Sequence, residues 1–410
     1  MKRLLLLLII IIPVYVFAQE EKKFGISFSG FVKSDIFLDT RQYLSFREGH
    51  FLLYPLGESL DLDSVDVNSK TNFNILSIQS RLTGNITGPD AFGAKSSAVL
   101  EGEFFGMSDA SINTFRLRHA LVKLNWQSTE LLVGQTWHPM FITDCFPGVI
   151  SFNTGAPFQP FSRNPQVRIT QTFGEIRIMA AAVTQRDFSS PGGSASIRNS
   201  AFPEIQLQLQ YNLADKDAGT EILAGVGGGY KILQPRLITD SMYQTNEKVK
   251  GISYLAFLKF KTPVITVKCE GALGQNLYDL TMLGGYAIKY TNDTAIINNN
   301  DYEYTTINCY SVWTDITTNG DKIQGGLFAA YSENLGSADY FIGDNFIRGI
   351  DIKYLYRISP RIIFNSGKVR FAGELEYTTA AYGHSDIQGL VKDASEISNL
   401  RALIAVYYFF

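Results

Sequence analysis

The chain has 410 residues, of which 45% are hydrophobic, 18% are charged and 13% are aromatic. The charged fraction lies below the roughly 25% of ordinary soluble domains, and the aromatic content excludes a disordered chain. A mean hydropathy near zero is too polar for a helical membrane protein, and no apolar run of about 20 residues occurs beyond the first residues. The net charge of −3 argues against a nucleic-acid partner. These bounds leave a β-rich chain that is either secreted or inserted in a membrane as alternating strands.

Residues 1–18 are predicted to be a signal peptide. A basic start is followed by an apolar stretch at 4–12, and Val16 and Ala18 supply the small residues of a cleavage site. An apolar stretch of about nine to fourteen residues is too short for a membrane anchor helix. We therefore expect an exported chain whose mature part, 19–410, forms a single domain.

The mature chain alternates apolar and polar residues with a period of two, as strands with one apolar face do. In 204–213, for example, Ile205, Leu207 and Leu209 alternate with glutamines. No convincing amphipathic helix is predicted. The pattern predicts strands at 24–37, 75–86, 94–105, 115–126, 130–137, 166–173, 175–184, 204–213, 220–233, 249–261, 263–275, 283–291, 302–313, 322–333, 345–357, 361–379 and 398–410.

The connections alternate in length, which is typical of an outer-membrane barrel with short periplasmic turns and long extracellular loops. In a soluble sandwich, by contrast, the apolar face would point inward and strands of five or six residues would be common. Many of the segments reach about ten residues, the length that a tilted strand needs to cross a bilayer. The tight turns are 88–90, 125–129, 173–175 and 261–263, and the long polar stretches are 38–70, 138–165 and 185–202.

The number of strands follows from the chain length. A hairpin with one short turn and one long loop takes about 45 residues, so the mature chain holds eight or nine hairpins. Bacterial single-chain barrels have an even number of strands, so at least one of the seventeen segments is misread. We expect it within 276–321, where the alternation is weak. We predict an all-β, transmembrane, antiparallel β-barrel of 16 strands, within a range of 14–18.

The last strand carries a separate signal, because its apolar face ends on a C-terminal aromatic residue. Such a strand is similar to the signal that the barrel assembly machinery reads in the outer membrane of Gram-negative bacteria, with Phe410 as its end. A core strand that happens to end in phenylalanine is the alternative. The apolar face consists of Leu400, Ala402, Ile404, Val406, Tyr408 and Phe410.

If the apolar faces contact outer-membrane lipid, charged residues of both signs face the lumen. A wide lumen lined in this way would be a water-filled channel, and a lumen closed by salt-bridged pairs is the alternative. The strand parity assigns to the lumen Arg81, Glu101, Glu103, Arg168, Arg177, Glu374 and Glu376.

The parity fails at Arg116 and Arg118. If Ala120 and Val122 face lipid, both arginines would face it too, which is costly near the midplane. Either a bulge near His119 switches the faces, or the arginines lie above the hydrocarbon. The sequence leaves both possibilities open.

The stretch 138–165 contains five prolines and five phenylalanines. Prolines lower its entropy and aromatic rings give it surface to pack, so we expect it to fold against another surface. Inside the lumen it would be a constriction loop, with Asp144 and Arg163 as candidate constriction residues. An extracellular cap at the centre of a trimer is the alternative.

One family resemblance rests on residues 115–137. Phe-Arg-Leu-Arg-His-Ala-Leu-Val, followed by Leu-Leu-Val-Gly-Gln-Thr-Trp, resembles two strands of the DcaP-like outer-membrane porins, and 164–169 resembles the strand after their constriction loop. The resemblance covers 110–185 and implies a trimeric, 16-stranded diffusion channel for small, often anionic solutes. The richness in Tyr, Asn and Phe indicates a Bacteroidota-type relative.

An enzyme is not predicted. The chain has four histidines, no Gly-x-Ser-x-Gly elbow and no His/Cys spacing of a zinc site, so neither a cofactor nor a metal is expected. The sequence predicts a homotrimeric porin for passive diffusion of small hydrophilic solutes. The arginines favour the passage of anions, and the glutamates favour the passage of cations. A plugged barrel that acts as an adhesin or a surface enzyme is the alternative function.

Overall fold

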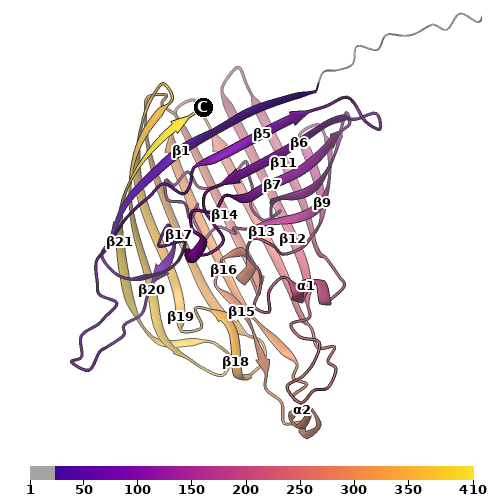
Figure 1. Ribbon diagram of the computed structural model, residues 1–410, viewed down its shortest axis with the longest axis vertical. Helices are drawn as coiled ribbons and strands as arrows, with labels where there is room; N and C mark the ends of the chain where they lie inside the picture. Colours follow the sequence, from indigo (N-terminus) through magenta and orange to yellow (C-terminus); the bar gives the residue numbers. More distant parts are fainter. Residues whose placement is uncertain (1–23) are drawn as a thin grey trace, which may run out of the picture.

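The computed structural model describes residues 24–410, apart from the side chains of 343–344; the predicted signal peptide, 1–18, lies outside the described residues. One antiparallel sheet closes on itself (Figure 1). Strand β1 (Gly25–Asp39) pairs with β21 (Val391–Phe409) on one side, and with β4 (Asn72–Leu76) and β5 (Arg81–Thr87) on the other. This closure leaves no unpaired edge, as a barrel in lipid requires.

The barrel has 16 strands, as predicted. The sheet contains 19 segments, but β4 and β5 are two parts of one barrel strand, and β15 (Gly284–Lys289) and β18 (Phe341–Arg348) pair with each other in the loops. The other barrel strands are β6 (Lys95–Glu103), β7 (Arg116–Asn125), β8 (Thr129–Trp137), β9 (Arg163–Phe173), β10 (Ile176–Val183), β11 (Glu204–Asp215), β12 (Thr220–Leu233), β13 (Val249–Lys261), β14 (Ile265–Gln275), β16 (Tyr304–Thr318), β17 (Ile323–Ser337), β19 (Ile352–Ser366) and β20 (Val369–Ser385).

Three predicted segments differ from the structure. The segment 283–291 is β15, a loop strand, so the misread segment lies within 276–321 as expected. The segment 361–379 is wrong as one strand, because it crosses a hairpin turn at Gly367, whose φ is 57°. The segment 345–357 runs from β18 into β19. Apolar and polar residues alternate on both sides of this tight turn, so a period-two pattern does not reveal where one strand ends and the next begins.

The two ends of the barrel differ as the connection lengths predicted. Short turns at 126–128, 174–175 and 262–264 lie at one end, which we call the turn end. The other end, the loop end, carries the long connections and two short helices, α1 (Ala195–Asn199) and α2 (Thr294–Asn299) (Figure 1). No helix among residues 24–410 has the length and apolarity to cross a membrane.

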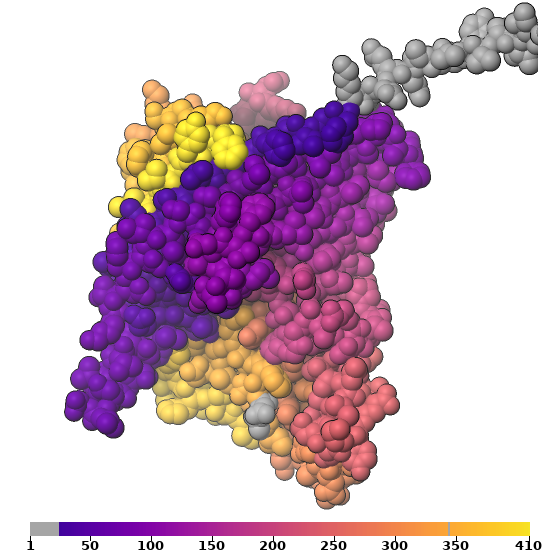
Figure 2. Space-filling model, viewed as in Figure 1, coloured from indigo at the N-terminus to yellow at the C-terminus, as the bar shows by residue number. Residues whose placement is uncertain are grey.

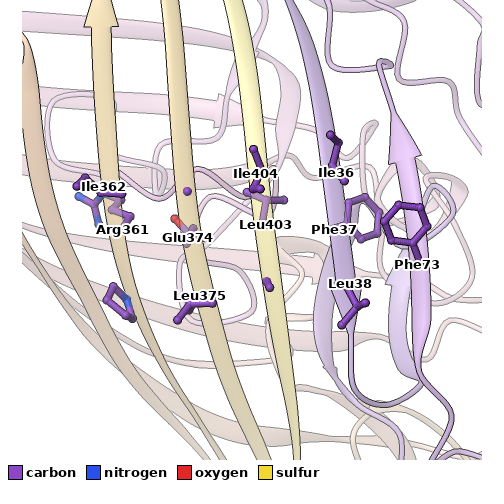
Figure 3. Close-up of a pocket in the computed structure, with 13 residues that line it drawn as sticks. Ile36, Phe37, Leu38, Phe73, Arg361, Ile362, Glu374, Leu375, Leu403 and Ile404 are labelled. Carbon is purple, nitrogen blue, oxygen red and sulfur yellow. The ribbon is translucent and has the colours of Figure 1, made fainter.

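The outer face of the barrel is apolar along its wall. Neighbouring residues of one strand point to opposite sides of the sheet. Glu374, for example, is buried inside the barrel, whereas Leu375 is exposed on its outer face. Figure 3 shows a groove on this face, where Ile36, Phe73 and Ile404 are 37–60% exposed. So much exposed apolar surface is a liability in water and is stable in lipid.

The wall is not equally tall all round. Strands β5 to β10 are 7 to 11 residues long, and we call them the low wall. The barrel strands from β16 to β21 have 15 to 19 residues. Figure 1 shows the short, strongly inclined strands of the low wall, and Figure 2 shows side chains of 24–110 covering that face.

Candidate pore and its constriction

Loop 138–165 lies inside the lumen and is fixed there from many sides of the barrel. Inward side chains of β1, β11, β14, β16 and β20 bind its backbone, and most of its residues are buried. The sequence left open that this loop is an extracellular cap, and the structure places the loop in the lumen instead. The contacts are Lys33 Nζ to Ile150 O (2.9 Å), Gln208 Nε2 to Pro139 O (2.5 Å), Lys268 Nζ to Phe146 O (2.9 Å), Ser311 Oγ to Phe158 O (2.7 Å) and Ile150 N to Glu374 Oε2 (2.5 Å).

A second segment also folds inward. The first long loop forms a hairpin of β2 (Tyr43–Phe46) and β3 (Phe51–Pro55), and three barrel side chains bind it. Sequence reasoning treated 38–70 only as an external loop, although the apolar run Phe51-Leu52-Leu53-Tyr54 signals burial. The contacts are Arg401 Nη2 to Gly49 O (2.9 Å), Arg357 Nη2 to Leu53 O (2.7 Å) and Tyr382 OH to Pro55 O (2.7 Å).

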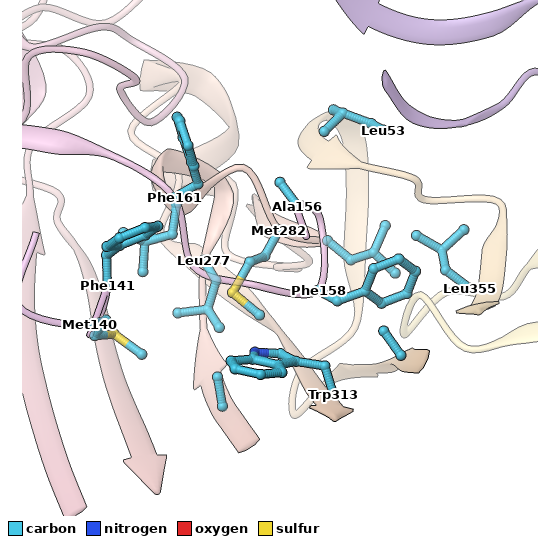
Figure 4. Close-up of a cluster of buried hydrophobic side chains, with 14 of the residues drawn as sticks. Leu53, Met140, Phe141, Ala156, Phe158, Phe161, Leu277, Met282, Trp313 and Leu355 are labelled. Carbon is cyan, nitrogen blue, oxygen red and sulfur yellow. The ribbon is translucent and has the colours of Figure 1, made fainter. Parts of the chain in front are cut away.

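The two inward segments meet in an apolar cluster inside the barrel (Figure 4). The rings of Phe51 and Phe161 lie 5.0 Å apart, and those of Phe105 and Phe152 lie 3.7 Å apart. Trp313 of β16 belongs to the same cluster, so the cluster also contacts the barrel wall. Because such packing leaves few voids, this cluster narrows the lumen more than the loop backbone alone would.

A cluster of charged residues joins the low wall to the loop. Glu103 is fully buried and lies 3.1 Å from Arg81, 2.8 Å from Arg116 and 2.7 Å from Arg118. The strand parity placed Glu103 and Arg81 in the lumen and left Arg116 and Arg118 open, and the structure brings all four together. Glu101 extends the cluster through a contact of 2.7 Å with Arg118.

A bulge on β7 turns both arginines inward. The register with β6 shifts between Glu101, opposite His119, and Gly102, opposite Leu117, so Arg118 is the extra residue. Arg116 and Arg118 are consequently buried, whereas Leu117 points outward and is 50% exposed. Of the two possibilities that the sequence left open, the bulge is the one observed.

Asp187 is the member of the charged cluster that sequence reasoning missed. This loop residue lies 3.0 Å from Arg116 and 2.8 Å from Arg163, which is the first residue of β9 and is also buried. Burial alone would raise the pKa of Asp187, but the guanidinium groups of Arg163 and Arg116 outweigh it and lower that pKa. No sequence pattern links 187 to 116, because loop contacts have no period.

Glu374 and Glu376, on the opposite wall, hold the loop. Glu374 accepts hydrogen bonds from loop backbone, and Glu376 accepts one from Asn153 Nδ2 at 2.6 Å and lies 3.1 Å from Arg357. Both glutamates face inward, as the parity predicted, and both are buried. Glu376 is therefore paired with Arg357, Glu374 is hydrogen-bonded to the loop backbone, and both side chains are buried.

Two cavities open at the turn end. The first, which we call the polar vestibule, has a volume of about 510 Å³ and is bounded by low-wall strands and by loop residues 143–144. The second, the aromatic vestibule, has about 440 Å³ and lies against β1, β5, β20 and β21. Loop 138–165 contributes residues to both, and Phe141, Phe152 and Phe161 of the apolar cluster line the aromatic vestibule as well.

The polar vestibule holds three of the predicted site residues. Arg168 donates from Nε to Gln166 Oε1 (3.0 Å) and from Nη2 to Trp137 O (2.9 Å). Among the described residues, no carboxylate oxygen lies within 4 Å of it. Arg177 lies 3.9 Å from Asp144, and both of these side chains are exposed by more than a third. Within 24–410, no group of His, Cys, Asp or Glu is arranged to hold a metal ion.

Comparison with known proteins gives a structural likeness only. No family model and no curated protein matches the sequence. The outer membrane channel DcaP of Acinetobacter baumannii is similar in fold, with a TM-score of 0.67 and 14% identity over 94% of this chain and 97% of that chain. The trimer form of OmpT, an outer membrane protein of Vibrio cholerae, gives a TM-score of 0.53 and 10% identity over 94% and 99%. At these identities the likeness shows the porin-like fold.

Proposed function

We propose that the chain is a porin of the outer membrane of a Gram-negative bacterium and lets small hydrophilic solutes, anions in particular, diffuse passively through its lumen. The observation that carries the proposal is Arg168, a cation without a carboxylate partner at the wall of a polar, open cavity. A lumen cation of this kind attracts anions in a low-dielectric channel.

The charges of the polar vestibule support this preference. Lys123 is 3.4 Å from Glu130, and Arg177 is 3.9 Å from Asp144, so both acidic residues are matched by a neighbouring cation. Arg168 remains as the excess positive charge. The glutamates that favoured cations are bound by arginines or by the loop. They therefore do not contribute to the net charge that faces the vestibule.

The narrowing of the lumen by the two inward segments sets the expected size limit for solutes. Loop 138–165 and the β2–β3 hairpin share the lumen, so only small solutes pass beside them. The same apolar cluster favours a second candidate function, a plugged barrel that serves as a surface adhesin or enzyme. Conduction separates the two, since a plugged barrel carries no current.

The remaining parts of the proposal concern export, assembly and oligomeric state. Residues 1–18 direct export, and Phe410, which directly follows β21 and is 45% exposed, is read by the barrel assembly machinery. The low wall forms the centre of a homotrimer. A groove of about 360 Å³ between Phe28, Leu100 and Phe115 on its outer face supports this, since a second copy can fill it.

The test of the proposal is the reversal potential of single channels in a salt gradient. Wild-type protein is expected to pass anions preferentially, and Arg168→Gln should shift the reversal potential toward cations. Arg198→Gln is the matched control, because Arg198 is exposed on α1 at the loop end. Equal reversal potentials for wild type and Arg168→Gln would remove Arg168 from the anion path.

A further inference from the structure

The hairpin that connects β5 to β6 at the turn end has an unusual residue at its tip. Ala91 and Ala94 are paired there by two backbone hydrogen bonds of 3.0 and 2.9 Å. The two residues between them, Phe92 and Gly93, have φ values of 53° and 73°. Two successive positive φ values are those of a type I′ turn, which favours Asn-Gly. Phenylalanine is poorly suited to the first of these positions, because a bulky residue with a positive φ is strained.

The ring of Phe92 makes little contact with its own chain, although its backbone is strained. The residue is 89% exposed. Among residues 24–410, eleven residues other than glycine have a positive φ, and Phe92 is the only aromatic one. Within the same range, no other aromatic ring and no cation packs against the Phe92 ring. A strained residue whose ring lies in solvent indicates a role outside the single chain.

The backbone around Phe92 is held firmly in place. Trp126 Nε1, from the neighbouring turn, donates a hydrogen bond to Phe92 O at 3.1 Å. Ser96 Oγ donates to Pro89 O at 2.6 Å and closes the base of the hairpin. A side chain presented from such a fixed turn costs little conformational entropy when it enters a contact. The turn is therefore suited to carry a contact residue.

The place of the turn favours a second copy of the chain as the partner. Residues 88–94 connect two strands of the low wall, which is the proposed centre of the homotrimer. In Figure 1 the connection between β5 and β6 extends past the side of the barrel, and Figure 2 shows a projection at this edge of the low wall. In a ring of three copies, a projection at one edge of the wall meets a different surface on the next copy.

From this geometry we propose that Phe92 is a contact residue between copies of the chain, and that its ring packs on the outer barrel wall of the neighbouring copy. A role at the lipid boundary explains less, because an aromatic residue there needs no left-handed backbone. Trp126 and Phe173 are exposed at the turn end without a positive φ. The inference rests on the proposed function, because it names a residue of the homotrimer contact.

Turn chemistry separates the contact from the fold. Phe92→Asn places a favoured residue in the type I′ turn and removes the ring. We expect its monomer to unfold at the same guanidinium chloride concentration as the wild-type monomer or at a higher one. The protein concentration for half assembly in detergent should rise at least about tenfold, because a buried ring is lost from each contact. Analytical ultracentrifugation measures the assembly.

Two variants serve as controls for the assembly. Phe92→Tyr keeps the ring and should assemble like the wild type. Val264→Asn should do so too, because Val264 is 72% exposed in a turn outside the low wall. Unchanged assembly of Phe92→Asn would refute the proposal. A Phe92→Asn monomer that is less stable than the wild-type monomer would also refute it, since the ring would then support its own chain.

Photo-cross-linking identifies what the ring contacts. With p-benzoylphenylalanine at position 92 and the protein refolded into lipid vesicles, we expect irradiation to give covalent dimers and trimers on denaturing gels. Adducts with lipid alone would place the ring at the membrane boundary and overturn the proposal. Cross-links confined to single chains would overturn it as well.

These outcomes are distinguishable from a failure of the proposed function. Trimers that form equally well without the Phe92 ring refute this inference and leave the homotrimer and the channel intact. A wild-type protein that stays monomeric refutes both the inference and the homotrimer. Conductance in single steps would still support the diffusion channel in that case.

Discussion

Neutralising Glu103 should weaken the barrel and leave its ion selectivity unchanged. Its carboxylate is fully buried and contacts three guanidinium groups within 3.1 Å, with Arg163 at 3.9 Å. Glu103→Gln leaves those four arginines with only Glu101 and Asp187 as buried counter-charges. Removing one partner of a buried ionic group costs about 3–5 kcal/mol.

The assay is equilibrium unfolding in guanidinium chloride of protein refolded into lipid vesicles. With a slope of about 2–6 kcal/mol/M, a loss of about 3 kcal/mol lowers the midpoint by roughly 0.5–1.5 M. Glu130→Gln is the matched control, because Glu130 is at the turn end and partly exposed beside Lys123, where such pairs contribute about 0–1 kcal/mol.

Two results would refute this reasoning. One is a midpoint for Glu103→Gln that equals that of Glu130→Gln. The other is a changed reversal potential with unchanged stability, which is the behaviour of a carboxylate that lines an open channel.

Two further predictions address the local structure. Gly134 has a φ of 137°, and a Cβ there would lie 2.2 Å from a backbone oxygen of β7, so Gly134→Ala should sharply reduce the yield of heat-modifiable barrel. Gly325→Ala is the control, because a Cβ at Gly325 would meet open space and should leave the yield unchanged. Equal yields for the two variants would contradict the close approach of β8 to β7 at Gly134. Burial raises the pKa of the Cys145 thiol to about 12, so iodoacetamide at pH 8 should alkylate it only after unfolding, while a cysteine introduced by Leu62→Cys, at a fully exposed position, reacts in the folded protein. Rapid alkylation of Cys145 in the native barrel would place loop 138–165 outside the lumen.

The architecture could be predicted because lipid imposes a simple rule on each strand. An outward residue must be apolar, so 204–213 shows its alternation plainly, and the closure into 16 strands follows from chain length and loop length. The same rule assigns Arg401 to the lumen, between the outward Leu400 and Ala402, where it binds Asp39.

The interior was harder to predict, because packing inside the lumen has no period. The bulge at Arg118 could be suspected from the failed parity, but only the register with β6 shows its position. The inward β2–β3 hairpin and Asp187 reach their partners through loops. For the same reason, Glu374 could be assigned to the lumen, whereas its role in holding Ile150 could not be foreseen.

The most direct test of the central claim is the current through wild-type protein in a planar lipid bilayer. A diffusion channel predicts stable conductance steps, in groups of three for a trimer, with a reversal potential that shows anion preference in a salt gradient. A folded, heat-modifiable barrel that gives no steps would contradict the claim, and the apolar cluster around Phe51 and Phe161 would then be a complete plug.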